Sequence, residues 1–399
     1  MNVSKQFEKP VRIGRILIIQ LGDIGDVVWS LPALHAVREA YPEAEISVLL
    51  REGNGSLLEA SASRLKIFEV RKPFRESLRL IRELRRQRFG FVFDFRGDER
   101  GAYMALLSGA PVRAAIHLPM LPGLRNRLFT HLVTPRPVSM AVNAADASLD
   151  LLGAFGIGHR SAVPRLDLTS EMKSRAEGML AGEGLFDAAL PTTAGGPRNR
   201  PEEARERTAG SKGGSGPVCG GDGSEMRSAI GNVRHPRAWV TLNPFSRWPY
   251  KEWSVGKWVQ LIDWLGEAFG ITAVVVGSPA ERERAAGLAS ACREGVCNMA
   301  GKTTLAELAA ILSLSPLHIG VDSAAPHIAA AVGTATVTLY GPSDWRYWAP
   351  RGGRHRAIAP DMDCAPCSLK GCGGEGVSRC LEGLAVERVE AVLREVLSA

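Results

Sequence analysis

Short apolar runs that stop at turn residues alternate along this chain with stretches of helical periodicity. The first run, Ile16–Ile19, is continuous and is soon followed by Gly22, which is typical of a strand buried on both faces. Two further strands are expected over Ala44–Leu50 and Gly90–Phe95, each preceded by a stretch that reads as helix. This alternation of strand and helix predicts an α/β fold built on a parallel sheet.

The helix expected after the first strand gathers its apolar residues on one face between Val27 and Val37. Pro32 lies inside this stretch, and proline removes a backbone donor from a helix interior. The sequence therefore predicts a helix that begins near Ser30 or is kinked there.

The same alternation returns in the last part of the chain. Strands are expected over Ala238–Phe245, Ile271–Gly277, Leu317–Asp322 and Ala335–Gly341, with helices over residues 253–270, 279–292, 303–315 and 326–333. Thr303 or Thr304 is expected to cap the third of these helices together with Glu307. The chain of 399 residues thus fits two domains, and the carboxyl ends of their strands predict a ligand cleft between them.

Residues 190–236 separate the two units and differ from them in composition. This stretch is rich in Gly, Pro, Ser and charge, so it cannot bury enough apolar surface to offset the entropy of ordering. We predict a disordered linker or insertion here. The predicted division is an N-terminal domain of residues 1–189, this linker, a C-terminal domain of residues 237–345, and a cysteine-bearing tail with a closing helix over residues 346–399.

The formal net charge of +7 favours an anionic partner, whether a phosphate-bearing substrate, a lipid surface or nucleic acid. No segment reaches the roughly 18 apolar residues that a membrane span needs. The run Ile16–Ile19 is also too short for the apolar region of a signal peptide. We therefore expect a cytoplasmic protein.

Two strand-to-helix junctions carry the features of an anion site. They are Gly22–Asp26 (GDIGD) and Gly320–Gly333 (GVDSAAPHIAAAVG), and a helix N-terminus offers free backbone N–H groups and a positive dipole. Asp322 also suits a helix N-cap, which is a purely structural interpretation. The chain has no G-x-G-x-x-G after the first strand and no P-loop motif, which argues against dinucleotide oxidoreductases and P-loop enzymes.

Five blocks of the sequence, in order, resemble the ADP-heptose:lipopolysaccharide heptosyltransferases of glycosyltransferase family 9. The blocks are LIIQLGDIGDVVWSLPAL, LNPFSRWPYKEWSVGKW, VVVGSPAERERA, MAGKTTLAELAAILS and GVDSAAPHIAAAVGTATVTLYGPSD. The tail, CAPCSLKGCGGEGVSRCLEGLAVERVEAVL, resembles the cysteine-bearing tail of that family. The resemblance covers nearly the whole chain except residues 190–236.

The resemblance implies a GT-B architecture, in which two Rossmann-like parallel-sheet domains face each other across a cleft. The N-terminal domain would bind the acceptor and the C-terminal domain the nucleotide-sugar donor. The implied reaction is inverting transfer of heptose from ADP-L-glycero-D-manno-heptose to the lipopolysaccharide inner core, on a lipid A-Kdo or heptosyl acceptor. The alternatives are a family member with another nucleotide-sugar or glycan acceptor, and a non-catalytic sugar-nucleotide or metal-binding module.

Individual residues match functional positions of the family. Asp26 matches the general base, and the donor-binding positions are matched by Ser246, Lys251, Glu281, Lys302, Asp322, Ser323, Ala324 and His327. Ala324 replaces the glycine usual in the family, and glycine would allow a positive φ or a closer backbone approach. A diphosphate leaving group needs positive charge as its bond breaks, which Lys251 and the helix after Asp322 can supply. Because no D-x-D motif is placed to hold an ion, we expect no required cofactor.

Two of these assignments compete with simpler interpretations. As a base, Asp26 would face the acceptor hydroxyl, opposite the leaving diphosphate, whereas as a structural residue it would only cap the first helix. The simpler interpretation of Lys251 is a solvated surface lysine. Asp23, three residues before Asp26, is expected to bond the backbone of its own turn.

The part of the chain expected to bind the acceptor shows the least resemblance to the family. Arg96 and Arg100 are candidates for binding an anionic lipid-linked sugar, and Arg100 matches a position where relatives place a lysine. The basic run Arg71–Phe89 also fits a solvated helix face or an anionic membrane surface. We expect an ADP-sugar donor and an anionic acceptor as partners, no nucleic acid, and peripheral contact with the cytoplasmic face of the inner membrane.

The tail carries four cysteines with the spacing C-x2-C-x4-C-x7-C, namely Cys364, Cys367, Cys372 and Cys380. This spacing is compatible with a structural zinc or iron–sulfur site. Only the first pair has the tight spacing of a zinc site, and no histidine lies inside the cluster. Free thiols and a redox-sensitive disulfide therefore stay as alternatives.

Overall fold

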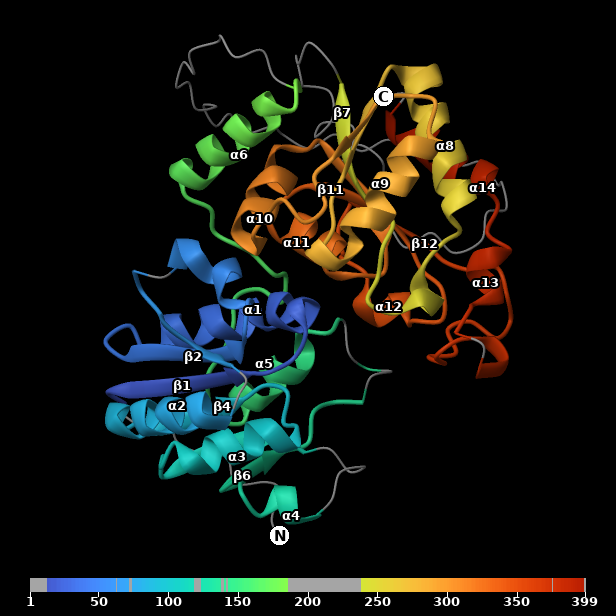
Figure 1. Cartoon of the computed structure of the whole chain (residues 1–399). Coiled ribbons are helices and arrows are strands. Elements are labelled where there is room, and N and C mark those ends of the chain that lie inside the picture. The colour runs from blue at the N-terminus through green and yellow to red at the C-terminus, as the bar shows by residue number, and fades with distance from the viewer. Residues whose placement is uncertain are drawn as a thin grey trace, which may run out of the picture.

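The computed structural model describes residues 13–61, 63–71, 74–117, 123–137, 140, 143–185, 238–374 and 376–397. The predicted linker, residues 190–236, lies outside the described residues. The described chain forms two six-stranded sheets in which the neighbouring strands run parallel, one in each half of the molecule (Figure 1). The predicted α/β class with two parallel sheets is therefore confirmed.

The first sheet has the strand order β3-β2-β1-β4-β5-β6. Its strands are β1 (Arg15–Gln20), β2 (Glu45–Arg51), β3 (Lys66–Val70), β4 (Phe91–Asp94), β5 (Val112–Ile116) and β6 (His131–Val133). In the central strand, Ile16 and Ile18 face one apolar core while Leu17 and Ile19 face another. The continuous apolar run is thus explained by burial on both faces of the sheet.

Three strands of this sheet, β3, β5 and β6, were not predicted from the sequence. Gly90–Phe95 was expected as the third strand, but it contains β4, and β3 precedes it. The β3 sequence, KIFEV, has charged residues between and beside its apolar ones, and β3 lies at the edge of the sheet. A search for continuous apolar runs does not find such a strand.

The second sheet has the order β12-β11-β10-β7-β8-β9. Its strands are β7 (Trp239–Asn243), β8 (Thr272–Val275), β9 (Val296–Asn298), β10 (Leu317–Val321), β11 (Ala335–Leu339) and β12 (His355–Ile358). The four strands expected here are β7, β8, β10 and β11, and the short strands β9 and β12 are additional.

The helices of the first half are α1 (Ile24–Ala40), η1 (Gly55–Ser61), α2 (Phe74–Gln87), α3 (Glu99–Leu107), α4 (Gly123–Asn126), α5 (Asp146–Gly153) and α6 (Ser170–Gly182). The expected start of the first helix near Ser30 is wrong, because α1 begins at Ile24 and includes Pro32. Asp23 occupies the N-cap position and Asp26 the third helical position, so the turn before the helix supports the earlier start.

The second half contains η3 (Pro249–Lys251), α8 (Val255–Phe269), η4 (Pro279–Glu281), α9 (Arg282–Ala291), α10 (Leu305–Leu314), α11 (Ala324–Ala331), α12 (Trp345–Trp348), η5 (Cys372–Gly374), α13 (Arg379–Glu382) and α14 (Val386–Leu397). The predicted capping box at α10 is confirmed: Thr304 Oγ1 accepts from the N–H of Glu307, whose carboxylate accepts from the N–H of Thr304.

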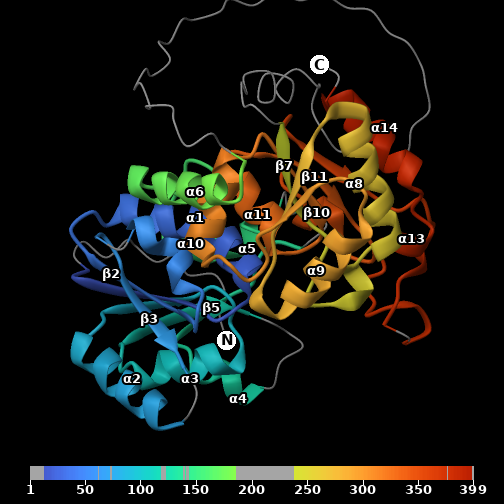
Figure 2. The ribbon, with the colours of Figure 1, turned by 45° about the horizontal axis from the view of Figure 1, so that its top comes forward.

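The two halves are joined by direct helix packing. The α1 helix packs against α11, and α6 crosses over to pack against α10 (Figure 2). Met172 and Leu180 of α6 share an apolar core with Val274 of the second sheet, although residues 1–189 were assigned to the N-terminal domain. In the tail, α14 completes the core of the second half. The exact domain limits stay a prediction.

None of the described helices is both long enough and apolar enough to cross a membrane.

Candidate functional site

The turn between β1 and α1 is shaped around the carboxylate of Asp26. Its Oδ2 accepts a hydrogen bond from the backbone N–H of Asp23 at 2.8 Å. A Cβ atom at Gly22 would lie 2.4 Å from this oxygen, so a side chain there would displace the carboxylate. Gln20 supports the turn by accepting from the N–H of Gly22 at 3.1 Å and donating to the Asp26 carbonyl at 3.3 Å. The GDIGD sequence therefore holds one acid in a fixed position.

The two oxygens of Asp26 differ in their contacts. Oδ2 also accepts from Arg96 Nη1 at 2.7 Å, while no described residue donates to Oδ1. The side chain is 24% exposed, so the carboxyl group is not sealed from solvent. The capping interpretation accounts for one oxygen and leaves the second available to a ligand.

The backbone that carries Arg96 is held by a second acid, Asp94, at the end of β4. Asp94 is completely buried, and its Oδ1 accepts from the N–H groups of Gly97 at 2.7 Å and Arg96 at 3.1 Å. Burial raises the pKa of this carboxyl to about 7. Asp94 thereby fixes the loop from which Arg96 reaches Asp26.

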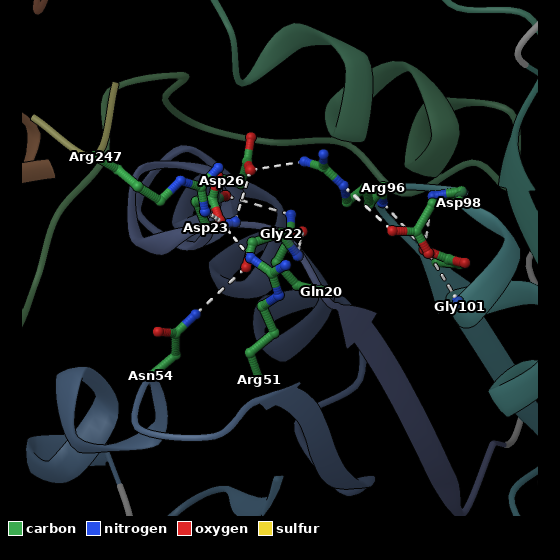
Figure 3. A network of polar contacts seen from close by, with 12 residues as sticks. Gln20, Gly22, Asp23, Asp26, Arg51, Asn54, Arg96, Asp98, Gly101 and Arg247 are labelled. Carbon is green, nitrogen blue, oxygen red and sulfur yellow. Dashed lines mark hydrogen bonds and ion pairs between the residues drawn. The ribbon is translucent and has the colours of Figure 1, made fainter. Parts of the chain in front are cut away.

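Asp23 is bound by two arginines from different parts of the chain. Figure 3 shows Arg51, at the end of β2, and Arg247, from the loop after β7, converging on this turn. Both guanidinium groups contact Asp23 Oδ1, the Arg247 Nη1 atom at 2.6 Å. Arg247 belongs to the second half, so this ion pair links the β1–α1 turn to the loop that carries Ser246 and Lys251.

Lys251 and Asp322 form the centre of the site on the second half. Lys251 Nζ lies 2.6 Å from Asp322 Oδ2, with the two side chains 23% and 6% exposed. Asp322 is not the N-cap of α11, because Ser323 occupies that position. The capping interpretation of Asp322 and the solvated interpretation of Lys251 are therefore both wrong. Ser323 Oγ donates to Asn243 Oδ1 at 3.0 Å, which ties the helix start to the end of β7.

His327 connects this pair to the turn of Asp26. A Cβ atom built on Gly25 would lie 3.3 Å from His327 Cδ2, and the Trp29 ring meets the imidazole edge-on at 5.6 Å between centroids. His327 Nε2 is 4.0 Å from Asp322 Oδ1. Burial lowers the pKa of His327 to about 4, although Asp322 opposes this shift. The neutral imidazole of His327 therefore lies between Gly25 and Asp322. Gly25 is the neighbour of Asp26 in the sequence.

The other predicted donor residues follow neighbouring strands at the same edge of the second sheet. Ser246 is buried, and its Oγ accepts from the N–H of Trp248 at 3.2 Å. Glu281 Oε2 accepts from the N–H of Ser278 at 2.6 Å, while Lys302 pairs with Glu183 at 2.5 Å. A Cβ atom on Gly301 would lie 2.9 Å from Pro279, so the loops of Glu281 and Lys302 are adjacent. Ala324 opens α11 in helical conformation, which alanine adopts freely.

The two acceptor candidates lie differently. Arg96 is drawn toward Asp26 and also lies 3.4 Å from Asp98. Arg100 is exposed near the start of α3 and has no ion pair with any residue that the structure describes. Only Arg96 is therefore part of the contact network around Asp26.

The four tail cysteines are free thiols in the structure. Cys364 is exposed, Cys367 and Cys372 are half-buried, and Cys380 is buried, where burial raises the pKa of its thiol. Within the described ranges, no three His, Cys, Asp or Glu side chains are arranged to hold a metal ion. A metal at these cysteines stays a prediction, which metal analysis of the purified protein tests.

Arg51 and Arg247 were not singled out from the sequence. Each lies at or just after the carboxyl end of a strand, as do Asp26 and Lys251. In parallel α/β folds, ligands gather at that edge of the sheet. A survey of the charged residues that follow every predicted strand would have found Arg51 and Arg247. The motifs considered above covered only some of these strand ends.

Comparison with known proteins agrees with this geometry. Residues 210–377 match the family model described as glycosyltransferase family 9 (heptosyltransferase). The chain is 23% identical over 337 residues to lipopolysaccharide heptosyltransferase 3 of Escherichia coli, covering 82% of this chain and 83% of the relative. The chain is thus similar to glycosyltransferase family 9 over residues 210–377 and to a heptosyltransferase over most of its length. It is therefore a glycosyltransferase.

Solved structures place this chain in the two-domain GT-B fold. A family 9 glycosyltransferase from Veillonella parvula superimposes with a TM-score of 0.72 at 19% identity, with both chains fully covered. An E. coli heptosyltransferase solved with ADP-2-deoxy-2-fluoro heptose gives a TM-score of 0.60 at 18% identity, over 96% of this chain and 99% of that one.

Proposed function

We propose that this enzyme transfers heptose, with inversion, from ADP-L-glycero-D-manno-heptose to the lipopolysaccharide inner core. The family, the heptosyltransferase relative, and the neighbour solved with an ADP-heptose analogue support this choice of donor. A non-catalytic sugar-nucleotide module is not favoured, because such a module needs no acid held with a free oxygen at this junction.

The observation that carries the proposal is the closeness of the acid and the cationic pair. Gly25 packs on His327, and His327 lies beside Asp322 and its partner Lys251. Only the side chain of His327 therefore lies between the turn of Asp26 and the pair of Asp322 and Lys251, which is proposed to meet the diphosphate. Transfer requires this juxtaposition, since the base and the leaving group act on the same anomeric carbon.

In the proposed mechanism, Asp26 Oδ1 accepts the proton of the acceptor hydroxyl as that oxygen attacks the anomeric carbon. Lys251 and the N–H groups at the start of α11 stabilise the negative charge that develops on the departing ADP. Inversion follows because attack and departure occur on opposite faces of the sugar. His327 is neutral near pH 7 and so adds no charge to this site.

The nucleotide end of the donor is proposed to lie over the adjacent loops. Ser246 would meet a phosphate, Glu281 the ribose, and Lys302 the nucleotide. Lys302 now pairs with Glu183, so nucleotide binding would exchange that ion pair for a contact with the ligand. Because cationic side chains meet the diphosphate, we propose that transfer needs no divalent ion and continues in EDTA.

The acceptor is proposed to be an anionic lipid-linked sugar. Arg96 lies at Asp26, where the acceptor hydroxyl must be placed, and Arg100 follows on the exposed start of α3. A lipid-linked acceptor would bring the enzyme to the cytoplasmic face of the inner membrane as a peripheral protein.

A donor screen tests the proposal. Binding of ADP-heptose, ADP-glucose, UDP-sugars and GDP-sugars is compared by calorimetry, and transfer to a deacylated inner-core acceptor is followed by NMR of the new anomeric centre. We expect ADP-heptose to be selected and the anomeric configuration to be inverted. Preference for another nucleotide-sugar, or retention of configuration, would contradict the proposal.

A further inference from the structure

The ion pair between Asp23 and Arg247 bridges the two halves of the enzyme. Arg247 Nη1 lies 2.6 Å from Asp23 Oδ1, and the side chains are 56% and 41% exposed. The two residues are 224 positions apart in the sequence. Arg247 stands one residue after Ser246 in the proposed donor loop, and Asp23 stands three residues before Asp26. The pair therefore joins the two parts of the site that must act together.

Each side chain of this pair is also held within its own half. Arg51 contacts the same Asp23 oxygen from the end of β2, and the Asp23 N–H donates to Asp26 at 2.8 Å (Figure 3). On the other side, the Arg247 guanidinium lies over the ring of Trp248 at 4.8 Å from the centroid. Trp248 stacks in turn on Tyr250. Neither Asp23 nor Arg247 is therefore a freely rotating surface side chain. Their contact holds the loop after β7 in place relative to the turn before α1.

We propose that Asp23 and Arg247 are positioning residues for transfer. Their ion pair fixes the donor loop, residues 246–251, against the base turn, residues 22–26, and so sets the distance from the base to the donor. This inference rests on the proposed function, because it gives the pair a role in the same reaction.

The expected signature separates rate from stability. Exposed ion pairs contribute little to folding, so loss of this pair should leave the melting temperature nearly unchanged. A misplacement of about 1 Å between reacting groups can slow a reaction by ~10²-fold. The pair should therefore affect kcat strongly while donor binding, which lies within the second half, is nearly retained.

A double-mutant cycle tests the inference on the full-length enzyme. The variants are Asp23→Asn, Arg247→Gln and the double variant, and asparagine remains a good N-cap at position 23. We expect each single change to lower kcat between about 10-fold and 10²-fold, with the dissociation constant of ADP changed less than about threefold. The double variant should lose no more than the worse single variant, because both changes break one contact. Arg247→Lys should recover part of the rate.

Arg175→Gln is the matched control. Arg175 pairs with Glu59 at 2.8 Å, with similar exposure, away from the site, and should leave kcat unchanged. Additive losses in the cycle, or unchanged kcat in both single variants, would overturn the proposal. So would a large loss of ADP affinity in Arg247→Gln alone, which would make Arg247 a phosphate ligand. If the parental enzyme transfers nothing from ADP-heptose, the proposed function fails, whereas an active parent with additive variants refutes only the positioning role.

Discussion

At the scale of single residues, two glycines decide where Asp26 can act. Gly22 leaves the space that the carboxylate occupies, and Gly25 lets α1 approach His327 of the other half. A side chain at Gly22 would push the carboxylate away from the Asp23 N–H, and one at Gly25 would crowd the imidazole at 3.3 Å. The two glycines of the motif thus support the position of the acid rather than contact a substrate themselves.

Asp26→Asn separates the base role from the capping role. Asparagine still offers an oxygen to the Asp23 N–H, so we expect the melting temperature and ADP affinity to be retained. Turnover should fall by ~10²-fold or more, the usual scale for loss of a general base. Steady-state kinetics and calorimetry measure the two effects. Asp98→Asn, which changes another aspartate beside Arg96, is the control, and a variant at position 26 with near-parental turnover would remove Asp26 from the mechanism.

Lys251→Met should weaken ADP-heptose binding and slow transfer together, because the lysine meets charge in both the bound donor and the departing diphosphate. The change also leaves Asp322 buried without its cation, which destabilises the fold. The double variant Lys251→Met/Asp322→Asn removes that stability effect and should still transfer slowly. Lys66→Met, at an exposed lysine of β3, is the control. Parental kinetics in the double variant would show that the pair is structural.

At the scale of elements, the closing helix α14 is part of the core of the second half. Its residues Val389 and Leu393 are fully buried against the second sheet and its helices. Leu393→Ala should therefore lower the free energy of unfolding by about 2–5 kcal/mol. Urea unfolding measures this change, with Glu395→Gln on the exposed face of the same helix as the control. Equal stability of the two variants would mean that the tail is only loosely attached.

At the scale of the whole molecule, buried histidines make the free energy of unfolding depend on pH. Burial lowers the pKa of His318 to about 3 and those of His327 and His355 to about 4, from an ordinary value of 6.5. Between pH 4 and 6.5 the unfolded chain therefore binds more protons than the folded chain. The free energy of unfolding should fall as the pH drops below 6.5.

Urea unfolding at pH 7.5, 6.5 and 5.5 measures this dependence. Each histidine contributes a loss on the order of 1 kcal/mol per pH unit below its unfolded pKa. Asp94 works in the opposite direction, because its raised pKa stabilises the fold as the pH falls from 7 toward 4. His318→Gln should flatten the profile. A parental midpoint that is constant from pH 7.5 to 5.5 would contradict the prediction.

The sequence by itself determined the α/β class, two parallel sheets and the placing of Asp26, Lys251 and Asp322 at strand ends. These features depend on local patterns: apolar runs buried on two faces, and polar residues where such runs stop. The capping box of α10 was readable for the same reason, since its partners are three residues apart. The edge strand β3 was not, because Lys66 and Glu69 break up its apolar run.

Only the tertiary structure decided which charges meet. Asp23 was expected to bond its own turn and is the N-cap of a capping box there, but Arg247 also reaches it from 224 residues away. The position of Asp322 suited an N-cap, but its carboxylate forms an ion pair with Lys251, 71 residues earlier. Ser323 is the N-cap of α11 instead. Such pairings depend on how two sheets are set against each other. A residue's neighbours along the chain do not contain that information, because ion pairs form between whatever charges the packing of distant elements brings within a few ångströms.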